Sequence, residues 1–564
     1  MKELIKITDL KDMLKKTGEL YGDRPAYKIR ENIGKYKIFT HKEVREMVDA
    51  LGTALIDLGL QGKRIAIIGK NRYEWEIAYL AIACGTGTVV PLDKSLPENE
   101  LKRLIERSEV EAIFYSAEYE ERLLNMVYHG VGKLKHLISM NAIHHRKGIY
   151  SQKELIETGK TLIDEGNRKF LDAKINPEEM NIMLFTSGTT SESKVVALCH
   201  RNLCSNLMDI AQVLDVDEND RMLSFLPLHH VFECTVGFLF SLYSGCQTSF
   251  CDGIRHIVEN LNEYEITFAA FVPAIYENIY YNIIKKLKKE GKWEPTQALM
   301  EQYKNASMEE KKQVFKDIQS FFGGHIHLLI SGAAALDKNV EEGFRAWGIN
   351  VCQGYGLTET SPVIGIETNT EFRVGSIGKP LPHVEAKLVD VNEEGIGELV
   401  VKGPNIMMGY YQNEEATKEV LKDGWFYTGD LAKIDEDGYI FICGRKKSVI
   451  VLKNGKNIFP EEMENLVNRI EGVKESFIFG KSNKKDKDDI RIHVKVVYDK
   501  EVVKEAYKVS TDEEIFSAIN NKIREINKTM PPYKAIRGLI LTETPLIKTT
   551  TSKIKRQEEI KTVV

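Results

Sequence analysis

Residues 184–194 read LFTSGTTSESK, and the interpretation of the whole sequence starts from this stretch. A short apolar run, NIMLF at 181–185, precedes it, and a second, VVAL at 195–198, follows it. The two runs predict a β-hairpin. Its loop offers hydroxyl groups, the backbone N–H groups around a glycine and the Lys194 ammonium, which together suit the oxygens of a polyphosphate. A polar surface hairpin is the alternative, because a short motif alone carries a real risk of being a false positive.

Length and composition indicate an ordinary globular protein of more than one domain. A chain of 564 residues is too long to fold around a single compact core, so two or more domains are expected. Its hydrophobic content of 43% and charged content of 29% are typical of soluble globular proteins. The net charge of −5 and the absence of a basic stripe interleaved with aromatic residues give no reason to expect a nucleic-acid partner.

Neither a secretory signal nor a membrane span is expected from the sequence. The start, MKELIKITDLKDMLKK, lacks the apolar core of a secretory signal, and no run of about 18 apolar residues could span a membrane. None of the eight cysteines forms a CxxC pair, which favours buried free thiols in a reducing cytoplasm over a zinc site or a disulfide framework. We therefore expect a cytoplasmic protein. The lysine run KKLKK at 285–289 favours a solvated helix face, with peripheral contact at a membrane surface as the minority alternative.

Helices and strands alternate through residues 40–116. Thr40 and Glu43 form a capping-box pattern, and apolar residues then recur at helical spacing as far as Leu58. Strands are predicted at 64–69, 88–92 and 112–116, and helices at 73–84 and 98–108. This order predicts a parallel sheet covered by helices.

A second α/β region begins near Asn181. It includes a helix from about 202, a buried strand in FAAFVP at 268–273 and a long helical stretch from 274 to about 319. Short strands and glycine turns between 375 and 444 predict a β-rich subdomain. A mixed segment beyond 448 reads as a separate domain of roughly 115 residues. We therefore predict an α/β fold with a large N-terminal domain at 1–443, made of layered α/β subdomains and the β-rich subdomain, a hinge at 444–448, and a small, mobile α+β C-terminal domain at 449–564.

Five stretches, in the same order, resemble motifs of the adenylate-forming, AMP-binding superfamily of acyl-CoA synthetases, peptide adenylation domains and beetle luciferases. They are TSGTTSESK at 186–194, LPLHHVFE at 226–233, QGYGLTET at 353–360, YTGD at 427–430 with GR at 444–445, and the segment 545–556. The resemblance covers nearly the whole chain. LPLHHVFE, FVPAIYENIYYNI, SGAAAL, GSIGKPLPHVE and KNGKNIFPEEME are similar to the long-chain fatty acyl-CoA synthetases.

The resemblance implies a fatty acid–CoA ligase that uses ATP and Mg²⁺. A medium- to long-chain fatty acid would react with ATP to give acyl-AMP and pyrophosphate, and coenzyme A would then displace AMP. No Asp near Phe232 is present to hold a substrate ammonium, which favours an unsubstituted acid. Transfer to an acyl carrier protein, activation of another carboxylic acid, and a binding protein without catalysis stay open as alternatives, as do a monomer and a homodimer.

The same resemblance assigns the nucleotide and metal ligands. Thr358 would bond the α-phosphate, and Glu359 would hold Mg²⁺ with Thr186. Tyr355, between Gly354 and Gly356, would stack on adenine. The loop groups implied for the β- and γ-phosphates are Thr186, Ser187, Gly188, Thr189, Thr190 and Lys194.

Further residues are assigned to the ribose, the acid and the second step. Asp430 would accept hydrogen bonds from the ribose hydroxyls, with Arg445 assisting. Lys553 would bridge the acid and the α-phosphate during adenylation, because a point charge on a flexible stem suits both groups. His230 would lie beside the acyl carboxylate, with a packed core histidine as the alternative.

The hinge assignments concern rotation of the C-terminal domain between the two half-reactions. Lys447 occupies the hinge position, and the loop at Gly455 would serve thioester formation; a basic linker is the alternative for Lys447. The chain departs from the family pattern at Ser191, Ser193, Val195, Ser448 and Ser552, and Ala274 replaces an arginine common in long-chain relatives. Serines in the loop keep hydroxyl donors but lose the freedom of glycine, so a stiffer loop is one expectation.

Overall fold

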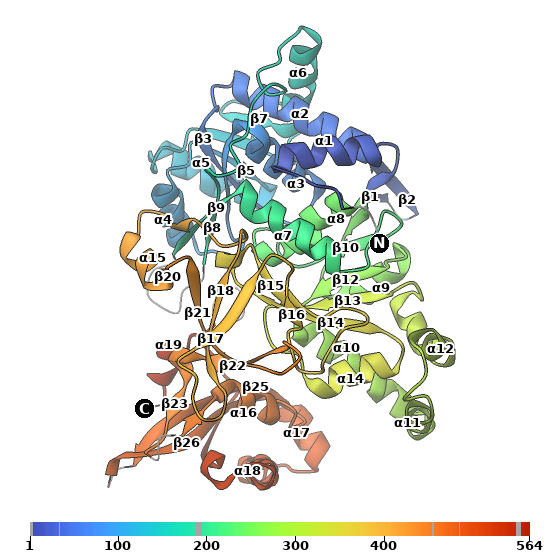
Figure 1. The fold of residues 1–564 in the computed structure, drawn as a ribbon, viewed down its shortest axis with the longest axis vertical. Helices are drawn as coiled ribbons and strands as arrows, with labels where there is room; N and C mark the ends of the chain where they lie inside the picture. The colour runs from blue at the N-terminus through green and yellow to red at the C-terminus, as the bar shows by residue number, and fades with distance from the viewer. Residues whose placement is uncertain are drawn as a thin grey trace.

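The computed structural model describes residues 4–32, 34–186, 194–453, 456–483, 486–548 and 554–563. Figure 1 shows the first α/β layer at the top, the second α/β layer below it at the right, the β-rich subdomain beside the second layer at the left, and the C-terminal unit at the bottom. This arrangement agrees with the predicted α/β class and with a large N-terminal part followed by a small C-terminal part.

An eight-stranded sheet forms the first layer, in the order β19-β9-β8-β4-β3-β5-β6-β7. Its centre is parallel, as predicted for residues 40–116. Helix α2 begins after the capping box of Thr40 and Glu43, as the sequence predicted. The strands are β3 (Lys63–Ile68), β4 (Gly87–Pro91), β5 (Ala112–Tyr115), β6 (His136–Ser139), β7 (Ile149–Ser151), β8 (Met180–Phe185), β9 (Val195–Cys199) and β19 (Gly409–Tyr410); the helices are α1 (Leu10–Leu20), α2 (His41–Asp57), α3 (Tyr73–Ala81), α4 (Glu98–Ser108), α5 (Glu120–Tyr128), α6 (Gln152–Asp164) and α7 (His200–Val213).

The hairpin around residues 184–194 is present. Strands β8 and β9 pair antiparallel, with Phe185 opposite Val195. Helix α3 is shorter than the predicted helix at 73–84, because its last turn becomes a π-helix, η1 (Ile82–Thr86). Its backbone departs from helical angles at Cys84 and Gly85. Gly85 adopts a φ of 144°, which only glycine accommodates without strain.

A nine-stranded sheet forms the second layer, in the order β16-β15-β14-β13-β12-β10-β11-β1-β2. Neighbouring strands from β14 to β1 run parallel, and the strands at both edges run antiparallel. The strands are β1 (Pro25–Asn32), β2 (Lys35–Thr40), β10 (Arg221–Ser224), β11 (Gln247–Phe250), β12 (Phe268–Phe271), β13 (Leu328–Ser331), β14 (Asn350–Gly356), β15 (Val363–Ile366) and β16 (Lys379–Pro380); the helices are η3 (Glu233–Leu239), a π-helix, with α8 (Phe240–Ser244), α9 (Ile257–Glu263) and α14 (Lys338–Ala346).

The predicted helical stretch from 274 to about 319 is confirmed as helical, and it consists of four separate helices. The structure divides it into α10 (Pro273–Lys289), α11 (Trp293–Gln302), α12 (Met308–Val314) and α13 (Lys316–Gln319). Gly291 adopts a φ of 67° just after α10, and Ser307 caps a new helix with Glu310. All four lysines of KKLKK lie exposed at the end of α10, in agreement with a solvated helix face.

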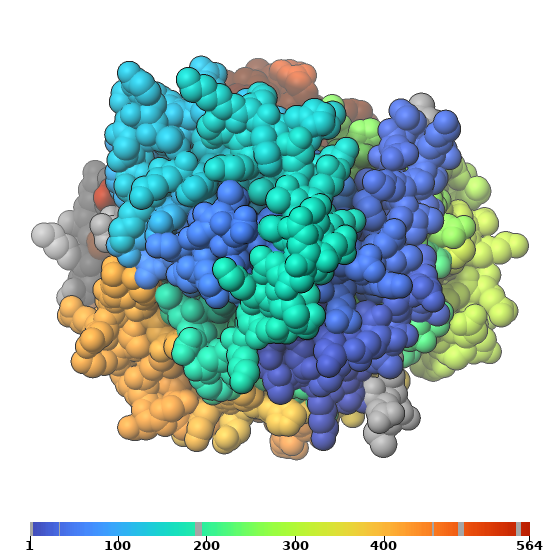
Figure 2. All heavy atoms as spheres, turned by 90° about the horizontal axis from the view of Figure 1, so that it is seen from above, coloured from blue at the N-terminus to red at the C-terminus, as the bar shows by residue number. Residues whose placement is uncertain are grey.

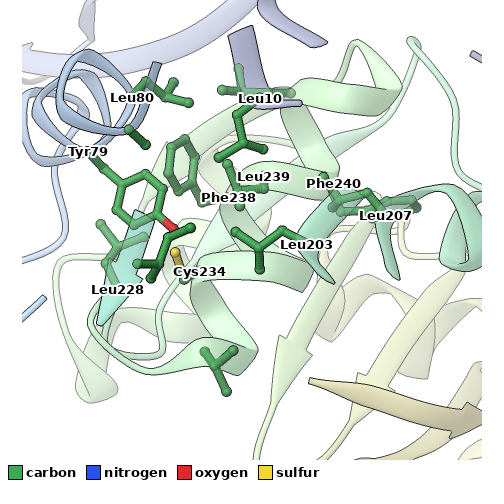
Figure 3. Close-up of a cluster of buried hydrophobic side chains, with 14 of the residues drawn as sticks. Leu10, Tyr79, Leu80, Leu203, Leu207, Leu228, Cys234, Phe238, Leu239 and Phe240 are labelled. Carbon is green, nitrogen blue, oxygen red and sulfur yellow. The ribbon is translucent and has the colours of Figure 1, made fainter. Parts of the chain in front are cut away.

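Aromatic side chains fill the core between the two sheets. Trp75 and Tyr79 of α3 stack with ring centres 5.6 Å apart, and Phe238 of η3 meets Tyr79 edge-on. Figure 3 shows the Tyr79 ring beside Phe238, with its hydroxyl directed toward the Cys234 sulfur. Viewed from above, the N-terminal segments cover this end of the molecule, and little of the C-terminal segment is visible (Figure 2).

The predicted β-rich subdomain is a five-stranded antiparallel sheet. Strand β22 runs through Arg445, and the short 3₁₀-helix η7 (Lys446–Ser448) follows, so strand pairing continues into the predicted hinge. The elements are β17 (Glu385–Val389), β18 (Gly397–Lys402), α15 (Glu414–Val420), β20 (Leu421–Lys422), β21 (Trp425–Ile434) and β22 (Ile440–Arg445).

The C-terminal unit packs helices on a three-stranded sheet, β25-β26-β27, and has a hydrophobic core of its own. Arg469 reaches across to the large domain, where its Nε lies 2.5 Å from Oδ2 of Asp337. The elements are β23 (Ile450–Val451), β24 (Asn457–Ile458), α16 (Pro460–Val467), β25 (Val473–Asn483), β26 (Asp486–Tyr498), α17 (Lys500–Tyr507), α18 (Asp512–Thr529), β27 (Ile536–Thr542) and α19 (Arg556–Ile560).

All eight cysteines are free thiols, as predicted, and six of them are buried. Within the described ranges, no helix combines the length and the apolar character needed to cross a membrane.

Candidate active site

A cavity of about 3030 Å³ extends between the two α/β layers, the β-rich subdomain and the C-terminal unit. The predicted site residues Ser187, Gly188, Thr189, Thr190, Gly455 and Lys553 lie outside the described residues. Every other predicted site residue is described by the structure and lines this cavity: Thr186, Lys194, His230, Gly354, Tyr355, Gly356, Thr358, Glu359, Asp430, Arg445 and Lys447. The structure therefore brings together residues that are as much as 261 positions apart in the chain, from Thr186 to Lys447.

Asp430 is the centre of a charged cluster at one side of the cavity. Its carboxylate accepts a hydrogen bond from the Tyr355 hydroxyl, and the Arg445 Nε lies 2.8 Å from its Oδ1. Asp430 is buried, with 3% of its surface exposed. A buried carboxylate needs such partners, because an unpaired buried charge is costly.

Strand register explains why these residues meet. Asp430 and Arg445 are directly paired residues of the antiparallel strands β21 and β22. The Thr428 hydroxyl donates to the Leu399 carbonyl at 2.7 Å and accepts from the Asp430 N–H at 3.0 Å, which ties the YTGD segment of β21 to β18. Gly429, between them, adopts a φ of 72° that favours glycine.

Burial and neighbouring charges shift the pKa values of Arg445 and Tyr355 in this cluster. Burial opposes the Arg445 charge, but Asp430, Tyr355 and Glu359 outweigh it and raise the guanidinium pKa above its usual value. Burial, together with the Asp430 charge and its hydrogen bond, raises the pKa of Tyr355 well above the usual range. Tyr355 is thus a neutral hydrogen-bond donor to Asp430 at any physiological pH.

Glu359 anchors a second group, which includes a residue that the sequence analysis missed. The Tyr410 hydroxyl donates to Glu359 Oε1 at 2.9 Å, and the Lys194 ammonium lies 4.4 Å from the centre of the Tyr410 ring. Tyr410 comes from β19, which pairs with β9 at the edge of the first sheet. It thereby places the base of the 184–194 hairpin next to the YGLTE segment.

Thr186 and Lys194 close the base of the hairpin loop. The Thr186 N–H donates to the Lys194 carbonyl at 2.9 Å. The two residues therefore stand at fixed positions on either side of the loop, and both side chains border the cavity. An ammonium and a hydroxyl in this position can contact the oxygens of an anion.

Two histidines follow the β10 strand into the cavity. His229 is largely enclosed, and burial lowers its pKa to about 4 although Asp93 lies 3.5 Å away. His230, the predicted site residue, accepts a hydrogen bond at Nδ1 from the Phe232 N–H at 3.4 Å.

Apolar side chains form another part of the same cavity. The Phe232 ring packs against Gly332, where an added Cβ would lie 2.9 Å from the ring. Ile210, Val236, Ile330, Val363 and Ile366 also line this part, together with the segment Gly332-Ala333-Ala334-Ala335-Leu336. The cavity therefore joins a charged region to an apolar one, which suits a ligand that is ionic at one end and apolar along its length.

Gln353, the first residue of QGYG, is a supporting residue that the sequence analysis did not single out. Its side-chain oxygen accepts from the Leu336 N–H at 2.6 Å, and its amide donates to the Ser376 carbonyl, also at 2.6 Å. It therefore ties the loop of small residues after β13 to β14. Long-range contacts of this kind leave no periodic signal in a sequence.

We expect Gly356→Ala to damage the site by forcing backbone apart. A Cβ at Gly356 would lie 1.9 Å from the Pro362 carbonyl oxygen, which is a backbone atom and cannot swing away. The free energy of unfolding should fall by about 3 kcal/mol, at the upper end of overpacking effects. Chemical denaturation measures the change. Gly18→Ala is the control, because its nearest neighbour is the flexible Arg45 side chain at 3.1 Å; an equal loss in both variants would contradict the account.

Comparison with known families gives two matches. The model described as AMP-binding enzyme matches residues 14–411, and the model described as AMP-binding enzyme C-terminal domain matches residues 447–562. Together the two matches cover most of the chain.

Curated relatives cover most of the chain as well. Fatty acyl-CoA synthetase B of Dictyostelium discoideum is 30% identical over 515 residues, which are 85% of this chain and 76% of that protein. Long chain acyl-CoA synthetase 6, peroxisomal, of Arabidopsis thaliana is 31% identical over 487 residues, which are 80% and 68% of the two chains.

Solved structures share the fold over the whole chain. The anthranilate CoA ligase AuaEII in complex with anthranoyl-AMP superimposes with a TM-score of 0.77 at 19% identity, covering 99% of this chain and 98% of that one. ATP-bound MatB from Rhodopseudomonas palustris gives a TM-score of 0.74 at 23% identity, covering 98% of each chain. At these identities the likeness concerns the fold alone.

Proposed function

This chain belongs to the family of AMP-binding enzymes, and we propose that it is an ATP-dependent ligase for medium- to long-chain fatty acids. It would convert the acid to acyl-AMP with release of pyrophosphate, and then to acyl-CoA. The relatives named as fatty acyl-CoA and long chain acyl-CoA synthetases support the substrate class.

One observation carries the proposal: a single cavity contains both the charged cluster and the apolar lining. Asp430, Arg445 and Tyr355 suit a nucleoside, and Lys194 with Glu359 suits phosphates and a cation. The apolar region around Phe232 and the small residues 332–335 suits an alkyl chain.

Asp430 and Arg445 are proposed to bind the ribose. The Asp430 carboxylate would accept hydrogen bonds from the ribose hydroxyls, while the Arg445 guanidinium, 2.8 Å away, orients the carboxylate. Tyr355 lies on the same side of the cavity, and its ring would stack on adenine.

Mg²⁺ fits the oxygen donors at Glu359 and Thr186. Glu359 supplies a carboxylate whose Oε1 is already oriented by Tyr410, and Thr186 supplies a hydroxyl; both border the cavity. Among the described residues, no group of three or more His, Cys, Asp and Glu side chains could hold a metal ion. One carboxylate plus phosphate oxygens is the usual way in which proteins hold Mg²⁺. The ion, when bound, neutralises charge on the phosphates.

For the first half-reaction, the acid must approach ATP against charge repulsion. A carboxylate oxygen attacks the α-phosphorus, the bond from that phosphorus to the β-phosphate bridging oxygen breaks, and pyrophosphate leaves with the electron pair. Lys194, Thr186 and the loop groups Ser187, Gly188, Thr189 and Thr190 would hold the leaving phosphates. Thr358 and Lys553 would hold the α-phosphate, and Lys553 would also bind the acid carboxylate.

The second half-reaction is proposed to use another face of the C-terminal domain. The thiolate of coenzyme A attacks the acyl carbonyl, and AMP leaves. Rotation about Lys447 would bring the Gly455 loop to the site and separate Arg469 from Asp337. An acyl carrier protein presents a thiol as well, and it stays the alternative acceptor.

Pyrophosphate release tests the proposal across a series of acids from acetate to stearate, with coenzyme A and with an acyl carrier protein as acceptors. We expect release with the longer acids and thioester on coenzyme A. Failure of every acid would overturn the ligase assignment. If pyrophosphate were released but the thioester formed only on the carrier protein, the acceptor would be the carrier protein and not coenzyme A.

We expect Asp430→Asn to raise the KM for ATP by about tenfold to a hundredfold, since hydrogen bonds to a charged group contribute more than neutral ones. The KM for the fatty acid should change little. Steady-state pyrophosphate release measures both constants. Asp437→Asn, at an exposed turn where Asp437 pairs with Arg373, is the control and should stay within about twofold of the wild type. A rise in the KM for the acid alone would contradict the ribose assignment.

A further inference from the structure

The turn between β10 and η3, residues 225–232, delivers His229 and His230 to the cavity. It has no regular secondary structure of its own over most of its length, so side chains must satisfy much of its backbone. Within it, the His230 N–H donates to the Pro227 carbonyl at 2.9 Å. What holds the turn in place therefore decides where His230 stands.

Glu233, the first residue of η3, reaches back to the start of this turn. The Ser224 hydroxyl donates to Glu233 Oε1 at 2.6 Å, and the backbone N–H groups of Phe225 and Leu226 lie close enough to the carboxyl group to lower its pKa. Glu233 is fully buried. Its second oxygen, Oε2, has no hydrogen-bond partner within the described part of the chain.

Asn71 holds the same turn from the opposite side. Its amide Nδ2 donates to the Leu226 carbonyl at 2.6 Å and to the Ser224 hydroxyl at 3.0 Å, and its Oδ1 accepts from the Leu228 N–H at 3.3 Å. Asn71 follows β3 of the first sheet, whereas Ser224 ends β10 of the second. The side chains of Asn71 and Glu233 thus fix the turn at the junction of the two layers.

We propose that Glu233 and Asn71 are positioning residues that hold the 225–232 turn so that His230 stands at the acyl end of the cavity. This inference rests on the proposed ligase function, since it concerns how the fatty acid reaches that site. Neither side chain lines the cavity, so each would act through the turn and not on the substrate.

The groups around Glu233 indicate that it works as a neutral acid. The titratable groups that face it are Glu76 of α3, which accepts from the Tyr27 hydroxyl of β1 at 2.7 Å, and Cys234 of η3, whose sulfur lies beside the Tyr79 hydroxyl (Figure 3). None of these groups is a cation. Burial raises the pKa of Glu233 from 4.5 to about 8, although the Ser224 hydroxyl and the nearby Leu226 and Phe225 N–H groups act to lower it.

The neutral state of Glu233 can be tested with two substitutions whose effects differ from those expected of a purely steric role. If Glu233 is neutral, Glu233→Gln keeps the acceptor oxygen and the charge state, and kcat/KM near neutral pH should stay within about threefold of the wild type. Glu233→Ala leaves the turn's donors without an acceptor. It should raise the KM for the fatty acid and lower kcat/KM for it by about tenfold to a hundredfold, with the KM for ATP unchanged.

Asn71→Ala should resemble Glu233→Ala, and the double variant should be little worse than either, because both act on one turn. Glu301→Gln, an exposed glutamate on α11, is the control for removing a negative charge. Additive losses in the double variant would contradict a shared role.

Thermal unfolding against pH supplies a readout that does not depend on activity. The folded-state pKa is raised, so the folded protein holds a proton that the unfolded chain has lost between pH 4.5 and about 8, and stability falls as pH rises through this window. Glu233→Gln removes that titration. Its Tm minus the wild-type Tm should therefore increase between these pH values and then level off.

The outcomes separate this inference from the ligase assignment. If the wild type released no pyrophosphate with any acid, the proposed function would fail, while the pH dependence of unfolding would still report on Glu233. If the wild type were active, a Glu233→Ala variant with an unchanged KM for the fatty acid would overturn the inference. A flat difference in Tm, together with a large loss in Glu233→Gln, would also overturn it by showing that an ionised Glu233 is required.

Discussion

Glu359→Gln is expected to lower the rate of acyl-AMP formation by about 10³-fold, a loss typical of removing a group that stabilises transition-state charge. The Glu359 carboxylate is proposed to hold Mg²⁺ at the phosphates, and glutamine cannot replace its charge. Glutamine does keep an oxygen that can accept the Tyr410 hydrogen bond of 2.9 Å. The substitution therefore tests the charge with little change in shape.

The measurement is single-turnover formation of acyl-AMP at increasing Mg²⁺. Tyr410→Phe is the matched control: it removes the hydroxyl that orients Glu359 but keeps the ring beneath Lys194. We expect a loss of about tenfold for this control, in keeping with one hydrogen bond to a charged group. If Glu359→Gln kept the wild-type rate and the same Mg²⁺ dependence, the metal would have to be held elsewhere.

Lys553→Ala is expected to separate the two half-reactions. Adenylation should fall by about 10²-fold to 10³-fold, because the variant lacks the positive charge proposed to bridge the acid and the α-phosphate. Thioester formation from supplied acyl-AMP should continue at nearly the wild-type rate, since the proposed second step uses the other face of the domain. Each half-reaction is followed by rapid quench and chromatography of acyl-AMP and acyl-CoA.

Lys561→Ala, an exposed lysine that follows α19, controls for the loss of a positive charge in the same domain. It should leave both half-reactions unchanged. An equal fall of both half-reactions in Lys553→Ala would contradict the division of labour between the two faces.

Local patterns in the sequence were sufficient for much of the fold. The capping box at Thr40 and Glu43 located α2, and the alternation that follows located the parallel strands. The region 274–319 was predicted as helical, but the breaks between its four helices were not located, because the apolar spacing continued across them. The stop at Gly291 and the capping pair Ser307–Glu310 were both present in the sequence as signals for separate helices.

Site residues were predictable where they lie inside a motif. The YTGD and GR segments gave Asp430 and Arg445, and the structure brings them together as cross-strand partners. Tyr410 and Asn71 were missed because each joins the site through pairing or packing with a distant segment. Glu233 was quoted within a motif, but nothing in the sequence showed that its side chain turns back onto the strand before it.

The central claim is that this cavity makes an acyl-adenylate from a fatty acid, and direct detection of that intermediate tests it best. The wild-type protein is mixed with ATP, Mg²⁺ and a radiolabelled long-chain fatty acid in the absence of coenzyme A, and the quenched products are separated. We predict label in acyl-AMP at close to one equivalent per protein, released as acyl-CoA when coenzyme A is added. Label that remained in the free acid, with no acyl-AMP at any chain length, would contradict the account.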